Sequence, residues 1–396
     1  MRLLHESSTA IAARYGVHFA LTRVLVRDVD RDRQLPLDGR LLTNDLNSFL
    51  AEDADVVIEA IGGHEPARTI ASTALGRGKK LITANKELVA SYGESLSALA
   101  DENNTGLDFG AAVGGSAPVI STLRDLVGAS TPLSVRGILN GTSNYIISML
   151  ESGVSLDAAL ASARERGLAE IDCARDLDGR DAAAKLAIIA WITFGILPTA
   201  LDIRRTSLIP GVERLVRCSS VTGGCVRLIA ECVQLSANRI AAAVEPVIVA
   251  ADNAFGRTKL EENRVEVDLG WSSPLSVSGP GAGSRPTAAA LLSDLLRFSP
   301  PPNARGTGAK HFVSVPDPRA HRWLIAAKLD TSSLKDAAAS VGLTSVLEGT
   351  EGSDTFIITH PAPWTRVERL VSDLQSSNAN PCVARHEINP ESENVQ

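Results

Sequence analysis

The first 117 residues alternate short apolar runs with amphipathic segments, and this alternation most limits the folds open to the chain. The apolar runs are rich in β-branched residues, and the segments between them have helical spacing. This order predicts a parallel sheet with right-handed crossover helices, a doubly wound α/β fold. The expected strands are 18–28, 55–63, 79–85 and 106–114, and the expected helices are 3–16, 66–78 and 86–104.

Small and polar residues follow three of the expected strands. They are Gly62-Gly63, Ala84-Asn85-Lys86 and Gly114-Gly115. Doubly wound sheets bind ligands beyond the carboxyl ends of their strands, so these residues predict a nucleotide or dinucleotide cleft. A glycine after a strand is often an ordinary turn residue, but three such places along one sheet favour the cleft.

The chain begins where the first helix of such a sheet is expected. A dinucleotide-binding half normally opens with a strand and a GxGxxG loop, whose glycines let the pyrophosphate approach a helix N-terminus. Neither precedes the helix expected at 3–16. Either the sequence lacks its true start, through a start codon assigned too far downstream, or the protein has lost this loop.

The remaining sequence suggests three further parts, since roughly 100–200 residues form one domain. Residues 118–275 mix helices with longer strands, and a glycine-rich turn and helix at 276–297 return to the first part. Residues 298–310 are a linker rich in proline, glycine and arginine. Residues 311–390 show the β-α-β-β-α-β order of a ferredoxin-like fold. The expected first domain is therefore 1–117.

Composition excludes several classes of protein. Apolar residues make up 44% of the chain, which is enough for a large core, and the net charge of −7 with no long basic run argues against nucleic-acid binding. No apolar stretch has the length of a membrane span, and the N-terminus is too polar for a secretory signal, so we expect a cytoplasmic protein. The five cysteines show no metal-ligand spacing and are expected to be reduced thiols.

The densest group of chemically active side chains lies in residues 167–190. Asp181 and Lys185 are four residues apart on one expected helix, and the helix is apolar after Lys185, so the lysine lies where burial begins. Such a pair is often only an exposed ion pair. Here lysine is scarce, with eight among 39 basic residues, and further acids precede it. These acids are Glu170, Asp172, Asp176 and Asp178.

These residue types suit an enzyme that oxidises a hydroxyl group with a nicotinamide. Such an enzyme needs a proton donor and acceptor at the substrate oxygen, and a partly desolvated lysine oriented by an aspartate can serve. Additional carboxylates can bind a substrate ammonium group. Lys86 directly follows an expected strand, so it either points into the cofactor cleft or is a solvated residue in a first helical turn.

Four blocks of the sequence resemble the homoserine dehydrogenase family in their order and spacing. They are ITANKELVA, ILNGTSNYI, GLAEIDCARDLDGRDAAAKLAI and GPGAGSRPTAAALLSDL, and the resemblance covers about residues 1–297. It implies a Rossmann-type sheet, here without its first strand, and interconversion of homoserine and aspartate 4-semialdehyde with NAD or NADP. This reaction belongs to the biosynthesis of threonine, methionine and isoleucine.

The resemblance also implies residue roles. Lys185 would be the proton donor and acceptor, with Asp181 beside it on the substrate hydroxyl. Glu170 and Asp176 would hold the substrate amino group, with the turn 140–144 flanking the pocket. The cofactor-contacting positions would be Lys86, Gly167 and Gly283.

Other features follow from the same resemblance. A monovalent cation would be held through Val113, Gly115 and Ala117, although Gly110 stands where the family has a glutamate. The tail resembles the ACT-like regulatory domain that binds amino acids such as threonine, and a homodimer or a higher homo-oligomer is expected. Arg27 favours NADP and the adjacent Asp28 favours NAD, so both cofactors stay open.

Two other functions remain open at this point. The chain could be a non-catalytic relative that acts as an amino-acid sensor or subunit partner, which the missing glycine loop favours. The retention of Glu170, Asp176, Asp181 and Lys185 together favours the enzyme, because a sensor needs no proton donor. An unrelated reductase with the same fold would have to match the acidic block and GPGAG by chance.

Overall fold

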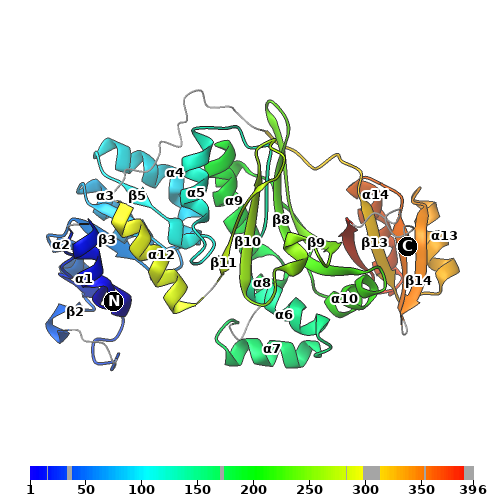
Figure 1. The fold of residues 1–396 in the computed structure, drawn as a ribbon, viewed down its shortest axis with the longest axis horizontal. Helices are drawn as coiled ribbons and strands as arrows, with labels where there is room; N and C mark the ends of the chain where they lie inside the picture. Colours follow the sequence, from blue (N-terminus) through cyan, green and yellow to red (C-terminus); the bar gives the residue numbers. More distant parts are fainter. Residues whose placement is uncertain are drawn as a thin grey trace.

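The computed structural model describes residues 1–15, 17–33, 38–169, 174–281, 283–297, 313–351 and 354–387. Figure 1 shows an N-terminal α/β part, a central part built on long strands and a C-terminal α/β part in a row. The expected linker at 298–310 lies outside the described residues. No helix among the described residues is both long enough and apolar enough to cross a membrane.

The N-terminal part contains two separate parallel sheets. One has the order β3-β4-β5, and the other pairs β1 with β2. The strands are β1 (Val24–Leu25), β2 (Leu42–Thr43), β3 (Val56–Glu59), β4 (Lys80–Thr83) and β5 (Leu107–Asp108). The helices are α1 (Arg2–Tyr15), η1 (Gly39–Leu41), α2 (Leu46–Ala51), α3 (Ala67–Gly76), α4 (Lys86–Glu102) and η2 (Gly110–Ala112). The parallel α/β arrangement is therefore confirmed.

Two expected strands are much shorter in the structure than predicted. The run 18–28 forms only β1, which pairs with a strand that the sequence did not suggest. The run 106–114 forms only β5, because the chain turns into the short helix η2 and then bends at Gly114 and Gly115, both with positive φ. An apolar run can thus be a turn when glycines allow it.

The central part is an antiparallel layer of long strands, with α9 packed on one face and α11 on the other. Its strand order is β11-β10-β6-β8-β9, and the short strand β7 pairs with β9. The strands are β6 (Ser134–Ile138), β7 (Arg204–Arg205), β8 (Gly224–Ser236), β9 (Arg239–Ala250), β10 (Glu262–Asp268) and β11 (Leu275–Pro280). The helices are α5 (Val119–Val127), α6 (Gly141–Glu151), α7 (Leu156–Glu165), α8 (Ala174–Leu177), α9 (Arg180–Phe194), η3 (Pro198–Ala200), α10 (Val212–Ser220) and α11 (Ala254–Arg257).

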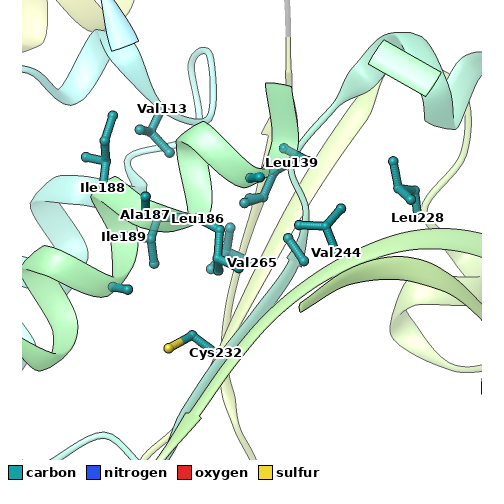
Figure 2. Close-up of a cluster of buried hydrophobic side chains, with 14 of the residues drawn as sticks. Val113, Leu139, Leu186, Ala187, Ile188, Ile189, Leu228, Cys232, Val244 and Val265 are labelled. Atoms are coloured by element: carbon teal, nitrogen blue, oxygen red, sulfur yellow. The ribbon is translucent and has the colours of Figure 1, made fainter. Parts of the chain in front are cut away.

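Helix α9 is the central element of the hydrophobic core. Figure 2 shows Leu186 of α9 beside Val265 of β10, whereas Ile188 lies near Val113 of the N-terminal part. Burial on both sides explains why the sequence of α9 is apolar all round. A positive φ at Gly179 and at Gly195 marks its two ends. Helix α12 (Ser284–Arg297) then returns to the N-terminal part and packs against α1, β4 and η2, as predicted for 276–297.

The C-terminal part has the predicted β-α-β-β-α-β order and its own hydrophobic cluster around Trp323. Its antiparallel strands lie in the order β16-β13-β15-β14. The elements are β12 (Val313–Ser314), β13 (Arg322–Ala327), α13 (Thr331–Ser340), β14 (Ser345–Glu351), β15 (Asp354–Thr359), α14 (Trp364–Ser376) and β16 (Cys382–His386). Strand β12, which precedes this unit, pairs with β9.

The C-terminal sheet is continuous with the central sheet, because β16 also pairs in parallel with β9. Buried charges stabilise this junction. The guanidinium of Arg385 on β16 lies 2.9 Å from the Glu231 carboxylate on β8 and 3.1 Å from that of Glu245 on β9. Arg136 on β6 contacts Glu387, just beyond β16, at 2.9 Å. The three strands β6, β8 and β9 are therefore all tied to the C-terminal unit.

Replacing Arg385 by alanine should destabilise the junction strongly. The change removes the cation that Glu231 and Glu245 share, although Arg319 stays 3.2 Å from Glu231 and Arg204 stays 2.7 Å from Glu245. The loss of hydrogen bonds to charged groups typically costs about 1.5–3 kcal/mol. We expect this decrease in the free energy of unfolding measured by urea denaturation. Lys335→Ala, which removes an exposed ion pair with Glu348, is the control. A decrease no larger than that of the control would contradict the role of Arg385.

Candidate active site

Two lysines converge on one aspartate where the N-terminal and central parts meet. Lys185 Nζ lies 2.8 Å from Asp181 Oδ2, one helical turn away on α9. Lys86 Nζ, from the first residue of α4, lies 3.1 Å from the other oxygen, Asp181 Oδ1. The predicted pair on one helix face is present. Lys86, which the resemblance links to the cofactor, joins the same cluster.

The packing of α4 against α9 places Lys86 at this point. A Cβ atom on Gly93 of α4 would lie only 2.8 Å from the ring of Trp191 on α9, so the two helices approach closely because residue 93 has no side chain. The ring of Trp191 also stacks on Phe109, with ring centroids 5.7 Å apart. These contacts join the middle of α4 to the last turns of α9, and the ion pair of Lys86 with Asp181 joins the first turns of the two helices.

The start of α4 is held by a second network, which the sequence analysis missed. The Asn85 side chain accepts a hydrogen bond from Leu88 N and donates one to the Gly63 carbonyl at 2.7 Å. Thr83 Oγ1 accepts from Asn85 N and donates to the buried carboxylate of Glu59. Asparagine directly before a helix was a usable signal, since it is a preferred N-cap. The glycine turn after β3 is thereby fixed to the residue that precedes Lys86.

Asp181 is buried but remains ionised. Burial favours the neutral acid, yet the positive charges of Lys185 and Lys86 and the hydrogen bonds that Asp181 accepts hold its pKa well below the usual value. The side chains of Asp181 and Lys185 are 12% and 14% exposed, and that of Lys86 is 31% exposed. Lys86 is therefore the most exposed of the three groups.

The end of β6 supplies further contacts to this cluster. Lys185 Nζ donates a hydrogen bond to the Leu139 carbonyl at 2.9 Å. The Asn140 side-chain amide donates to Asp176 Oδ1 and to Asp181 Oδ2, both at 2.8 Å. Burial and the nearby negative charge of Asp181 raise the pKa of Asp176, although the Asn140 hydrogen bond opposes the shift. Asp176, Asp181 and Lys185 thus form one hydrogen-bonded group around Asn140.

Among the described residues of 167–190, no other acid belongs to this hydrogen-bonded group. Asp178 forms an ion pair with Arg180 at 2.6 Å, next to the start of α9. Glu170 and Asp172 lie outside the described residues. Gly167, with φ 70°, follows α7, and the adjacent Leu168 carbonyl accepts a hydrogen bond from Thr142 Oγ1 at 2.6 Å.

The glycine-rich turn before α12 reaches the same region. Gly281 N donates to the Glu261 carbonyl at 3.0 Å, and a Cβ atom on Gly141 would lie 2.9 Å from that carbonyl oxygen. Gly283 has φ 115°, and its carbonyl accepts from the backbone and hydroxyl of Thr287. Gly281 therefore lies beside the start of α6.

The segment predicted to hold a monovalent cation is a tight turn next to this loop. Val113 and Ala117 are buried, Gly115 has φ 62°, and the Ala117 carbonyl accepts from Val119 N at 2.7 Å. In the described part of the chain, no group of three or more His, Cys, Asp or Glu side chains is arranged to hold a metal ion. A cation bound through main-chain oxygens at Val113, Gly115 and Ala117 stays a prediction.

Asp294 on α12 is a buried acid next to this turn that the sequence analysis did not identify. Its carboxylate accepts from Ala111 N at 3.1 Å and fills the space where a side chain on Gly110 would lie. Burial and the negative charge of Asp108 raise the pKa of Asp294 to about 6. Arg124 forms an ion pair with Asp108 and opposes the shift. Near neutral pH, α12 therefore carries a buried carboxylate that is costly to ionise.

Asp294→Asn should remove a pH-dependent cost of stability. The folded state raises the pKa of Asp294 from 3.8 to about 6. The contribution of the protonated acid to the free energy of unfolding is therefore complete below about pH 4 and is lost as the pH rises through about 6. Asparagine resembles the protonated acid, so we expect the variant to be more stable than the wild type by about 1–3 kcal/mol at about pH 8, with no gain at about pH 4.

Urea denaturation at the two pH values measures this difference. Asp125→Asn is the matched control, because Asp125 is an exposed carboxylate on α5. The same gain at both pH values would show that the effect is packing and not charge.

Two family models match the chain. One, described as homoserine dehydrogenase, matches residues 118–296, and the other, described as the NAD-binding domain of homoserine dehydrogenase, matches residues 2–109. A homoserine dehydrogenase from Mycobacterium tuberculosis is 36% identical over 302 residues, covering 75% of this chain and 68% of that protein. One from Bacillus subtilis is 30% identical over 298 residues, covering 75% and 69%.

Solved structures show the same similarity in three dimensions. A homoserine dehydrogenase from Thiobacillus denitrificans aligns with a TM-score of 0.84 at 27% identity, covering 98% of this chain and 94% of that one. A mutant hyperthermophilic archaeal homoserine dehydrogenase in complex with NADPH aligns with a TM-score of 0.53 at 25% identity, covering 62% and 71%. The first alignment includes the C-terminal part, whereas the matched family models end at residue 296.

Proposed function

Because the chain belongs to the homoserine dehydrogenase family, we propose that the cluster of Lys185, Asp181 and Lys86 is the site where it acts as an NAD(P)-dependent oxidoreductase. The reaction is the interconversion of L-homoserine and L-aspartate 4-semialdehyde. The observation that carries the assignment is the partly buried Lys185 amine between the Asp181 carboxylate and the Leu139 carbonyl. The comparisons do not favour a non-catalytic sensor.

Lys185 is the proposed proton donor to the aldehyde oxygen, and the proton acceptor in the reverse direction. An ammonium group has three N–H donors, and Asp181 and Leu139 occupy two of them, so one is left for the substrate oxygen. The nicotinamide, when bound, supplies the hydride to the aldehyde carbon or removes it from the alcohol carbon. Lys185 moves the matching proton at the oxygen, so that charge balances in both directions.

Asp181 and Asp176 have different proposed roles. Asp181 stays ionised, so it can orient the Lys185 amine and accept a hydrogen bond from the substrate hydroxyl. Asp176, together with Glu170 from outside the described residues, is proposed to bind the substrate amino group. A bound ammonium group would offset the burial that raises the pKa of Asp176.

The residues present fit a nicotinamide cofactor at the carboxyl ends of β3 and β4. Gly62 and Gly63 follow β3 with positive φ, and a Cβ atom at either position would meet no atom within 4 Å, so there is open space beside this turn. Lys86, Gly167 and Gly283 are the proposed contacts of NAD or NADP. A monovalent cation at the turn of Val113, Gly115 and Ala117 is proposed on the resemblance alone.

We also propose the division of the chain into domains that the sequence suggested. Residues 1–117 with 276–297 form the cofactor domain, 118–275 the substrate domain, 298–310 the linker and 311–390 an ACT-like regulatory domain. The return of α12 to η2 and the separate C-terminal core support this division. The family resemblance supports a homodimer, and the four described cysteines, all buried and unpaired, support a cytoplasmic location.

Lys185→Ala should abolish most of the turnover and spare cofactor binding. We expect homoserine oxidation, followed by the absorbance of the reduced nicotinamide with NAD and with NADP, to fall by at least about 10²-fold, the usual scale of general acid catalysis. Cofactor affinity, measured by fluorescence titration of NADPH, should be unchanged. Lys328→Ala, an exposed lysine of the C-terminal part, is the control and should behave as the wild type. Near-normal turnover of Lys185→Ala would eliminate the assignment.

A further inference from the structure

Asn140 occupies a position where one side chain touches both acids of the site. It is the residue after Leu139 at the end of β6 and caps the N-terminus of α6, and it is only 4% exposed. Its amide nitrogen donates to Asp176 Oδ1 and Asp181 Oδ2, both at 2.8 Å. Its amide oxygen accepts from Ser143 N at 2.7 Å.

These contacts allow only one orientation of the amide. The nitrogen has two donors, and both carboxylates can only accept when ionised. Rotating the amide by half a turn would place its oxygen against two carboxylates and its nitrogen against the Ser143 N–H, so three favourable contacts would become repulsive. The orientation of the Asn140 side chain is therefore fixed by its neighbours, and the amide can in turn fix the carboxylates of Asp176 and Asp181.

We propose that Asn140 is a positioning residue for the dehydrogenase reaction, which fixes the carboxylates of Asp176 and Asp181 and thereby the direction in which Lys185 presents its proton. The inference rests on the proposed function. Leu139 strengthens it, because its carbonyl accepts directly from Lys185 Nζ at 2.9 Å. Two consecutive residues at the end of one strand thus hold three groups of the site.

The charges around Asn140 explain why a neutral donor is needed there. Asp176 comes from α8, Asp181 and Lys185 from α9, and Lys86 from α4. Two buried carboxylates repel each other, and a neutral amide between them lowers this cost by donating one hydrogen to each. A carboxylate in the same place would add a third negative charge and remove both donors.

Asn140→Asp tests this role without removing the helix cap. Aspartate has nearly the same size and can still accept from Ser143 N, since aspartate is also a preferred N-cap. We expect kcat for homoserine oxidation to fall at least about tenfold. We also expect the acid limb of the pH profile of kcat/KM to move up by about one pH unit, because an added negative charge favours every protonated form in the cluster. Asn140→Ser keeps a helix cap and one hydrogen-bond donor. Its kcat and its pH profile should therefore lie between those of the wild type and those of Asn140→Asp.

The matched control is Asn253→Asp, because Asn253 caps α11 through Gly256 N and touches neither carboxylate. It should have the pH profile of the wild type. An Asn140→Asp enzyme with lower thermal stability but an unshifted pH profile would overturn the proposal, since Asn140 would then act only as a cap.

A measurement without substrate separates this inference from the proposed function. Asn140→Asp raises the pKa values of folded-state acids, so its loss of Tm relative to the wild type should be larger at about pH 8 than at about pH 5. A pH-independent loss would contradict the placement of Asn140 between two acids. If Asn140→Asp shows this pH-dependent loss of Tm but the wild type shows no homoserine turnover, the proposed function fails while the placement of Asn140 stands.

Discussion

The ion pairs of Asp181 with two lysines are the interaction on which the arrangement of this molecule depends. A buried carboxylate is stable only when its charge is compensated, and here one compensating amine comes from its own helix and the other from the N-terminal part. The ion pairs therefore require α4 and α9 to lie side by side. They also place the two amines where the N-terminal part meets the central layer of strands.

The hydrophobic core holds in place the helices that carry these charged groups. Helix α9 is buried on both sides, so it cannot rotate or slide without breaking contacts in the N-terminal and central parts. Gly93 lets α4 approach the Trp191 ring, and Asn85 ties the first turn of α4 to the turn after β3. Polar groups at the ends of rigid elements thus form the site, and apolar groups along those elements keep it in place.

Local patterns in the sequence predicted the structural features that are set by residues close to one another along the chain. The spacing of Asp181 and Lys185, the alternation in residues 1–117 and the order of helices and strands along the C-terminal unit are all of this kind, and the structure shows each of them. What the sequence could not predict depends on contacts between distant segments. Lys86 reaches Asp181, and Asn140 joins Asp176 to Asp181, only because α4, α8, α9 and the end of β6 converge.

The short strands of the N-terminal part show a second limit of prediction. Apolar content alone suggested long strands at 18–28 and 106–114, but strand length also depends on a partner and on backbone conformation. Asp294 was missed for a related reason, because its burial results from the return of α12 and not from its own surroundings in the sequence. Its partner Gly110 has no side chain to signal the contact.

The junction of β9 with β16 has a mechanical consequence. Backbone hydrogen bonds run without interruption from the outermost strand of the C-terminal unit to β6, and the two residues after β6 contact Lys185, Asp176 and Asp181. A sheet resists shear between its strands, so a twist applied at one edge is carried along this path as a change of curvature. The C-terminal unit is thus joined through paired strands to the strand that leads into the candidate site.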